Sequence, residues 1–182
     1  DGAGGTNRKT TAARIKTYAG GAAVMNDLTD VSMDITNFVD GLLIQTDTDG
    51  SAPGTGTLNG ATGNIGIGKD TFAALTTGDY NVFLGYSSGA ALTTGSNNVA
   101  IGKGAGAAIT EGATIVAIGL DALAAEDTDS DAVAIGANAL KANDQGNHNI
   151  AIGKDALKAN VAGSKNVAIG WQAGMTQANA DS

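Results

Sequence analysis

The chain contains no cysteine and a single proline, and aromatic residues make up only 4% of its 182 positions. The absence of cysteine excludes a disulfide framework and thiol chemistry. Aromatic side chains supply much of the buried area of an ordinary globular core, so their scarcity argues against one thick core. No apolar run approaches the length of a membrane span, and no signal peptide is visible. The 28 glycines and the many Ala, Val and Ile residues favour thin, regular layers instead.

The net charge of −8 is unevenly distributed along the chain. Residues 1–16 carry +3, from four basic residues against Asp1, so the remaining residues carry −11. An acidic surface repels the phosphates of nucleic acid, and a basic patch this short does not indicate a nucleic-acid partner. We therefore expect neither nucleic acid nor a membrane span.

Glycine recurs every 17 residues over the C-terminal two thirds of the chain. The repeat glycines are Gly68, Gly85, Gly102, Gly119, Gly136, Gly153 and Gly170. Ile or Leu stands one position before each of them, and Val or Ile stands three positions before. Branched residues at alternate positions predict a short strand, and the fixed period predicts a stack of similar units.

A second glycine follows the repeat glycine by ten residues in five of the repeats, at Gly78, Gly95, Gly112, Gly146 and Gly163. We expect this glycine to supply the positive φ of a tight turn. The apolar residues between the two glycines fit either a helical turn or a second strand. Glycine at Gly89, Gly106 and Gly174, where other repeats have Leu, favours a strand-like or irregular segment.

The sequence therefore predicts an all-β fold, a parallel β-roll or β-solenoid of seven 17-residue coils over residues 64–182. Each coil is expected to contain a strand, a turn, a strand-like segment and a turn. Residues 50–63, which hold Pro53 among Gly, Ser and Thr, are interpreted as a linker.

Residues 1–49 are expected to form a small α+β connector. Thr10 or Thr11 is a candidate cap for a short helix that runs to Tyr18. Asp40-Gly41, between Phe38-Val39 and Leu42-Leu43-Ile44, predicts the turn of a β-hairpin.

The position between the two branched residues of each strand is small in six of the seven repeats. It is Gly66, Phe83, Ala100, Ala117, Ala134, Ala151 and Ala168. A strand with one face in water would carry polar residues here, and none occurs. We therefore expect the interior of the coil to cover one face and a second copy of the chain to cover the other. This interpretation places Ala100, Ala117, Ala134, Ala151 and Ala168 in an interface between copies.

Asparagine occupies the position before the strand in five repeats, at Asn64, Asn81, Asn98, Asn149 and Asn166. Stacked at this position, the side chains predict an amide ladder along the axis of the roll. The alternative is that each is an ordinary turn residue.

The strings Asn98-Val99-Ala100-Ile101-Gly102 and Asn166-Val167-Ala168-Ile169-Gly170 resemble the head repeat of trimeric autotransporter adhesins, the YadA-like heads. The longer version with Ala-Leu-Thr-Thr-Gly at Ala91–Gly95 resembles the variant found in bacteriophage tail and head fibres. The resemblance covers roughly residues 61–182. It implies a left-handed parallel β-roll, a homotrimer formed through the inner strands, an attachment role and no catalysis.

We therefore expect a structural, non-enzymatic virion fibre protein that needs no cofactor and serves host attachment as a trimer. The alternatives are the head of a bacterial surface adhesin and, more remotely, an ice-binding solenoid that uses Thr76-Thr77 and Thr93-Thr94. The expected location is the virion, or alternatively the bacterial cell surface. Thr6–Thr11 and the segment 27–31 resemble parts of marine phage tail-fibre proteins, which makes the connector a candidate contact with other virion fibre, capsid or tail proteins.

Few residues suggest a ligand site. Candidate calcium ligands are Asp47 and Asp49 in one acidic cluster, which matches only the start of a calcium loop and lacks its distal Glu. Glu126, Asp127, Asp129 and Asp131 form another cluster, which is equally compatible with a solvated turn. Candidate receptor contacts are Tyr80, Tyr86 and Trp171, for which packing between chains is the alternative. The string Gly63–Lys69 has the spacing of a phosphate-binding loop, but Asp70 follows where Ser or Thr is required. The only histidine, His148, has no nucleophile beside it in the sequence.

Overall fold

The computed structural model describes residues 31–32, 38–39, 42–44, 59–125, 128 and 130–175. These residues form eleven short strands and no helix. The strands are β1 (Val31–Ser32), β2 (Phe38–Val39), β3 (Leu42–Ile44), β4 (Ala61–Thr62), β5 (Ile65–Ile67), β6 (Val82–Leu84), β7 (Val99–Ile101), β8 (Val116–Ile118), β9 (Val133–Ile135), β10 (Ile150–Ile152) and β11 (Val167–Ile169).

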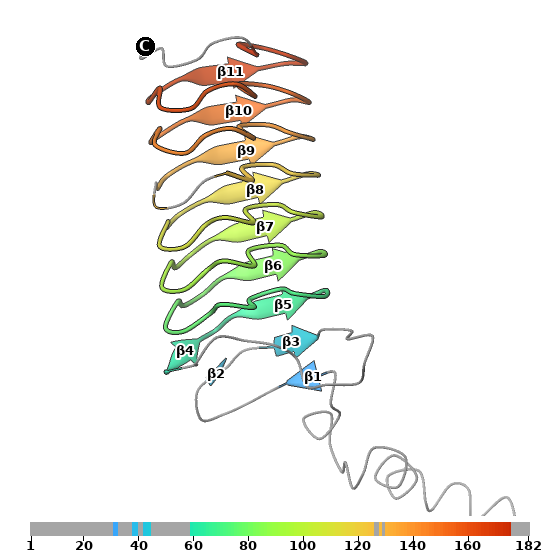
Figure 1. Cartoon of the computed structure of the whole chain (residues 1–182), viewed down its shortest axis with the longest axis vertical. Helices are drawn as coiled ribbons and strands as arrows, with labels where there is room; N and C mark the ends of the chain where they lie inside the picture. The colour runs from blue at the N-terminus through green and yellow to red at the C-terminus, as the bar shows by residue number, and fades with distance from the viewer. Residues whose placement is uncertain are drawn as a thin grey trace, which may run out of the picture.

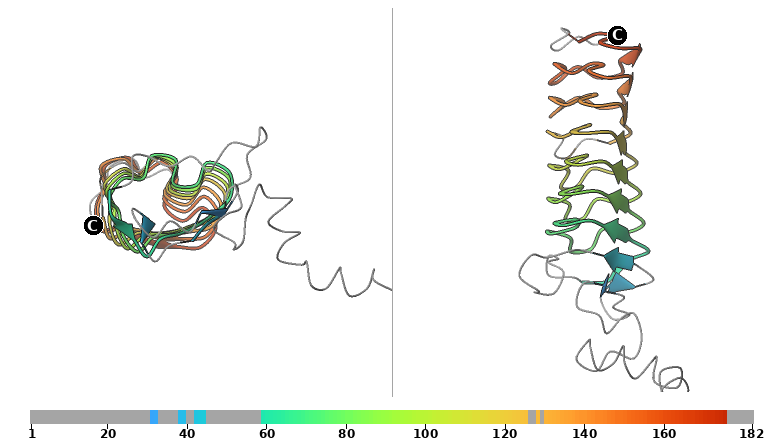
Figure 2. Two further views of the ribbon diagram at one scale, coloured as in Figure 1. Left: turned by 90° about the horizontal axis from the view of Figure 1, so that it is seen from below. Right: turned by 90° about the vertical axis from the view of Figure 1, so that its right-hand side faces the viewer.

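Strands β5–β11 are parallel neighbours in one sheet, and each residue pairs with the residue 17 positions later. The chain thus winds as a β-solenoid, with one strand per coil (Figure 1). Seen from the end, the coils superpose as a closed loop with the sheet along one wall and an inward dip in the opposite wall (Figure 2). The predicted parallel β-solenoid is confirmed.

The sheet begins before the first repeat. Strand β3 pairs in parallel with β5, β1 pairs antiparallel with β3, and β2 pairs with β4. The hairpin predicted at Asp40-Gly41 is therefore wrong, because β2 and β3 pair with different strands. Leu43 explains why β3 pairs with β5 rather than β2, since its side chain is buried against Gly66 in the core of the first coil. The predicted helix at residues 10–18 and residues 50–58 of the predicted linker lie outside the described residues.

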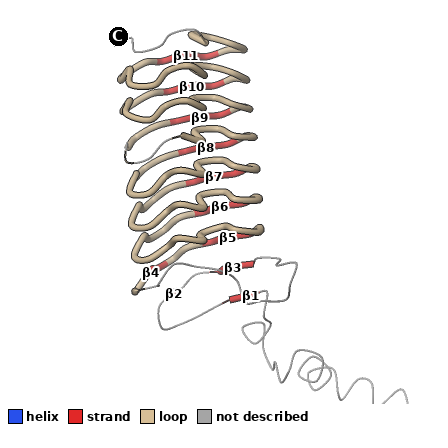
Figure 3. The backbone as a smooth tube through the Cα atoms, viewed as in Figure 1, coloured by secondary structure: helices blue, strands red, loops and turns tan. Residues whose placement is uncertain are grey.

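The rest of each coil consists of turns rather than a second strand (Figure 3). The predicted strand-like segment is therefore wrong. Residues two and four positions after the repeat glycine adopt left-handed φ angles, as at Asp121 (50°) and Leu123 (51°), and left-handed residues cannot continue a strand. After the second of them the chain turns tightly, with Leu75 N–H donating to the Phe72 carbonyl at 3.1 Å.

The two sets of glycines have different roles. The repeat glycines have φ between +127° and +138°, which other residues rarely adopt. The second glycines do not have positive φ, so that prediction is wrong. They are required by close approach instead: a Cβ added at Gly78 or Gly95 would collide with the backbone carbonyl of the corresponding glycine one coil further on.

The core of the roll is one narrow apolar column. It includes Leu75, Leu92 and Ile109 from the turns, and in it the central strand residue shares a limited volume with the residue six positions later. Where the first is Phe83 the second is Gly89, and where the first is Gly66 the second is Phe72. The rings of Phe72 and Phe83 stack with centroids 4.8 Å apart. Ala117, Ala134 and Ala151 are followed in the same way by Leu123, Leu140 and Leu157, all buried.

Candidate interaction surface

The alanines assigned to an interface between copies lie inside the roll. Ala100, Ala117, Ala134 and Ala151 are fully buried within the single chain, and Ala168 is 8% exposed. The assignment of these five residues to a trimer interface is therefore wrong. Ala117, Ala134 and Ala151 are small because a leucine from the opposite wall occupies the same narrow core, and next to Ala100 and Gly106 the space is filled by Ile109.

The face of the sheet that points away from the core carries the branched residues. It consists of two columns, Ile65, Val82, Val99, Val116, Val133, Ile150 and Val167, and Ile67, Leu84, Ile101, Ile118, Ile135, Ile152 and Ile169. We call this surface the aliphatic face. Its middle residues are half-buried, because each is partly covered by its neighbours in the column. None of its residues is polar, which is unusual for an antiparallel or parallel sheet face in contact with water.

Buried asparagines precede five of the seven repeat strands beneath this face. Asn64 Oδ1 accepts from the backbone N–H of Asn81 at 2.9 Å and from its Nδ2 at 3.0 Å. Asn81 Nδ2 also donates to the Gly95 carbonyl at 2.9 Å. The same arrangement joins Asn149 to Asn166. The amide ladder is confirmed, and it is interrupted where Ile115 and Ala132 replace asparagine.

Two corners border the aliphatic face. The strand-start corner holds the residue two positions before each strand, in order Tyr80, Asn97, Thr114, Asp131, His148 and Lys165, all of them exposed. Their φ angles lie between 56° and 62° although their side chains differ widely. The strand-exit corner holds the residue after each repeat glycine, including Tyr86, Lys103 and Trp171.

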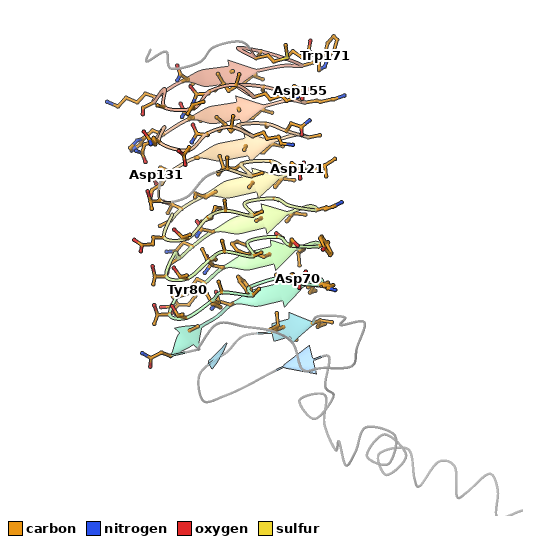
Figure 4. The ribbon with its side chains drawn as sticks, in the orientation of Figure 1. Asp70, Tyr80, Asp121, Asp131, Asp155 and Trp171 are labelled. Atoms are coloured by element: carbon orange, nitrogen blue, oxygen red, sulfur yellow. The ribbon has the colours of Figure 1, made fainter. Side chains whose placement is uncertain are left out.

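Carboxylates near both corners bind to neighbouring coils. At the strand-start corner, Asp131 accepts from Thr114 Oγ1 at 2.6 Å and lies 3.6 Å from His148 Nε2. Next to the strand-exit corner, Asp155 accepts from Asn138 Nδ2 at 3.0 Å and lies 3.2 Å from Lys158 Nζ. The hydrogen bond from Asn138, and to a lesser extent Lys158, lowers the pKa of Asp155 although burial opposes the shift. Figure 4 shows these carboxylates along the two edges of the sheet.

The predicted calcium ligands do not form a site among the residues the structure describes. Asp47, Asp49, Glu126, Asp127 and Asp129 lie outside them, and Asp131 is engaged by Thr114 and His148. Within the described ranges, no three His, Cys, Asp or Glu residues are grouped so as to hold a metal ion.

The three aromatic candidates are accessible but far apart. Tyr80, Tyr86 and Trp171 are 60%, 50% and 72% exposed. Tyr80 lies at the strand-start corner and packs over Gly63, whereas Tyr86 and Trp171 lie at the strand-exit corner five coils apart. That separation is about 24 Å at 4.8 Å per strand, so these residues do not form one aromatic site. Lys103 Nζ lies 5.8 Å from the Tyr86 ring centroid, a cation–π contact.

The surface that sequence reasoning missed is thus the aliphatic face itself. The sequence does contain a signal for its orientation. Where the central strand residue is large the residue six positions later is small, and the reverse, which indicates that the two share the interior. Among the described residues there is no helix of the length and apolarity needed to cross a membrane. No protein-family model, characterised protein or solved structure matches the chain.

Proposed function

We propose that this chain is a rod-shaped structural module of a virion fibre, used for host attachment, and that it assembles as a homotrimer through the aliphatic face. The observation that carries the proposal is the all-aliphatic outer surface of β5–β11, which a single chain leaves uncovered. Solvent-facing strands normally alternate apolar and polar residues. A face without polar residues along the whole rod is best explained as a contact surface.

The size of the face sets a condition on the contact. Seven strands about 4.8 Å apart and about 10 Å long give an area of roughly 340 Å². This area lies within the range of the largest apolar patch on a monomeric protein, about 300–600 Å², and such a patch is often functional. A stable interface buries about 800 Å² on each partner, so the contact must also include the corners beside the strands. Tyr80 and Tyr86 provide large exposed side chains at these corners.

The fibre role is supported by the shape and by the repeat. A solenoid of short coils is a rod whose lateral surface consists of turns and one narrow sheet, as expected of a spacer or fibre segment. The resemblance of the Asn-Val-Ala-Ile-Gly strings to fibre and adhesin repeats favours attachment. The version with Ala-Leu-Thr-Thr-Gly favours the virion over the bacterial surface, where an adhesin head would use the same rod and the same face.

The side chains exposed on the turns do not favour an ice-binding surface. The outward column that starts with Thr77 and Thr94 continues as Glu111, Thr128 and Gln145. This sequence of side chains gives no long, regular threonine array.

Light scattering coupled to size-exclusion chromatography tests the assembly. We expect the full chain to have three times the mass of one chain. Ile118→Lys places a charge in the middle of the aliphatic face and is expected to give a folded species of one-chain mass, because a buried unpaired charge is costly. Thr94→Lys, on an exposed turn away from the sheet, is the matched control and is expected to remain trimeric.

A wild-type chain that runs as a monomer at micromolar concentration would contradict the proposed assembly, as would a trimer of the Ile118→Lys variant. Attachment is tested separately, by binding of the trimer to a glycan array. We expect Trp171→Ala to reduce binding, because its ring is 72% exposed and can stack on a sugar. Absence of binding to glycans and to host cells would contradict the attachment role and leave a spacer.

A further inference from the structure

The turn that leads into β4 contains Asn59 and Gly60, the only Asn-Gly pair of the chain. Both residues are exposed. The backbone nitrogen of the residue after an asparagine can attack the Cγ atom of that asparagine. Glycine hinders this attack least, because it has no side chain and its backbone adopts many conformations. The pair is therefore a candidate site for a covalent change that the chain makes on itself.

The register places this pair in a ladder of turns. Asn59 lies one repeat before Thr76, and its N–H donates to the Thr76 carbonyl at 2.8 Å. In the same way, Thr76 N–H donates to the Thr93 carbonyl at 3.0 Å. The backbone immediately before the reacting side chain is thus attached to the next coil.

The nitrogen of Gly60 differs from those of its equivalents in later coils. Thr77 N–H also donates to the Thr93 carbonyl, at 3.1 Å, and Thr94 N–H donates to the Thr110 carbonyl, at 3.2 Å. Gly60 N–H makes no equivalent bond, nor any other hydrogen bond within the described residues. Its conformation differs as well, since its φ is +87° whereas neither threonine has a positive φ. The attacking nitrogen is therefore not held by a hydrogen bond in the folded protein.

The asparagines of the amide ladder are protected from the same reaction. All five are buried, and each is followed by Val or Ile, whose branched side chain is stiff and crowds the next nitrogen. Their amides are also engaged, as at Asn64, whose Nδ2 donates to the Gly78 carbonyl at 2.8 Å. Next to Gly60, by contrast, no atom apart from its chain neighbours lies within 4 Å of the point where a Cβ would stand. The two reacting groups of Asn59-Gly60 thus have room to meet.

We propose that Asn59-Gly60 is a self-modification site, at which the chain converts Asn59 into aspartate and isoaspartate. The Gly60 nitrogen loses its proton to water or hydroxide and forms a bond to Asn59 Cγ. The bond from Cγ to the amide nitrogen breaks, and this nitrogen leaves as ammonia. Water then opens the cyclic imide at either of its two carbonyl carbons. The net reaction takes up water and releases ammonia, and it requires no oxidant, reductant or cofactor.

The reaction changes the entrance of the roll in two ways. Either product adds a negative charge to a chain that is already acidic. Isoaspartate also lengthens the backbone between the attached Asn59 N–H and Gly60, because the chain then runs through the former side-chain carbon. The Gly60 carbonyl accepts from Thr62 Oγ1 at 3.0 Å, and β4 pairs with β2. The lengthened link therefore acts on the strand that joins β2 to the first coil.

Peptide mass spectrometry of the full chain, incubated at mildly alkaline pH, tests the site. We expect the replacement of NH₂ by OH to accumulate at Asn59 at least about tenfold faster than at Asn64 or the other ladder asparagines. Isoaspartate methyltransferase should label the product, and the rate should rise with pH because the attacking nitrogen must lose its proton. Gly60→Ala is expected to slow the reaction at Asn59 by at least about tenfold, because the added methyl group restricts the backbone.

A second Asn-Gly pair separates the effect of the fold from that of the motif. Thr76→Asn together with Thr77→Gly places the pair one repeat later, where the glycine N–H is in position to bond to the Thr93 carbonyl. We expect the new pair to react more slowly than Asn59 in the folded chain and at the same rate in urea. Equal rates in the folded chain would overturn the role given to the free Gly60 nitrogen.

The wild-type chain provides an independent test should the double variant fail to fold. Folding is expected to slow the reaction at Asn59 by less than about threefold relative to urea, and to slow it much more at the ladder asparagines. A rate at Asn59 that is no higher than at Asn64 in the folded chain would overturn the proposal. The outcome is independent of the proposed fibre role and trimer, because the reaction requires only one chain.

Discussion

Asp155 links two coils through a single carboxylate. Asn138 donates to it from the preceding coil and Lys158 from its own, and 9% of the side chain is exposed. The hydrogen bond from Asn138 is the main reason that the pKa of Asp155 is lowered from its ordinary value of 3.8, with Lys158 and Lys154 adding to the effect. A lowered pKa in the folded state means that the ionised form stabilises the fold.

The stability that Asp155 contributes should therefore depend on pH. It is expected to be fully present above its unfolded pKa of 3.8 and to be lost as the pH falls through the lower folded pKa. Asp155→Asn should be less stable than the wild type at pH 7, and the difference should shrink at pH 3. Denaturant unfolding of both proteins at the two pH values measures this. A difference that is equal at both pH values would contradict the assignment.

In five of the seven coils a large and a small residue, six positions apart, divide one core volume. Phe83 is paired with Gly89, and the ring occupies the space where a side chain on Gly89 would stand. Later coils have Ala and Leu at the same two positions, as in Ala117 and Leu123. The φ of Gly89 (+56°) is close to that of Leu123 (51°), so the backbone is already suited to the exchange.

Substituting both residues together should therefore restore most of the stability that either single substitution removes. Phe83→Ala alone leaves a cavity and is expected to cost about 3–5 kcal/mol. Gly89→Leu alone overpacks the coil and is expected to cost about 1–3 kcal/mol. The double variant should cost less than Phe83→Ala alone, although the ring contact with Phe72 is lost. A double-mutant cycle of the free energies of unfolding measures this coupling. Strictly additive effects of the two substitutions would contradict the shared volume.

The strands, their spacing and their parallel stacking were predictable from sequence, because branched residues and glycine repeat with one period. The orientation of the strand was not, since Val99, Ala100 and Ile101 are all apolar and alternation alone does not separate inside from outside. The role of Gly95 was missed because close approach of two backbones leaves no local signal. Leu43 was assigned to a hairpin because its partner, Gly66, is distant in sequence and belongs to another coil.

At the scale of the whole molecule the contacts are between adjacent coils, so the rod should tolerate the loss of a complete coil. Deleting Val99–Ile115 joins Asn98 to Val116 and preserves the Asn-Val-Ala-Ile-Gly string. We expect a folded rod shorter by about 4.8 Å, detectable by small-angle scattering.

The matched control deletes one residue fewer, Val99–Thr114, and so shifts every following residue out of register. We expect this variant to unfold at lower temperature than the full-coil deletion, because a one-residue shift exchanges the inner and outer positions of a strand. Equal stability of the two deletions, measured by circular dichroism during heating, would contradict a register set by the 17-residue period.

The strand-start corner has a consequence for how such a rod evolves. A tyrosine, an amide, a hydroxyl, a carboxylate, an imidazole and an ammonium group follow one another there on almost identical backbone. Point mutations at these sites alter the exposed edge of the rod while the scaffold beneath is preserved. Under the attachment role proposed above, the specificity of this edge can therefore change by one residue at a time without loss of the fold.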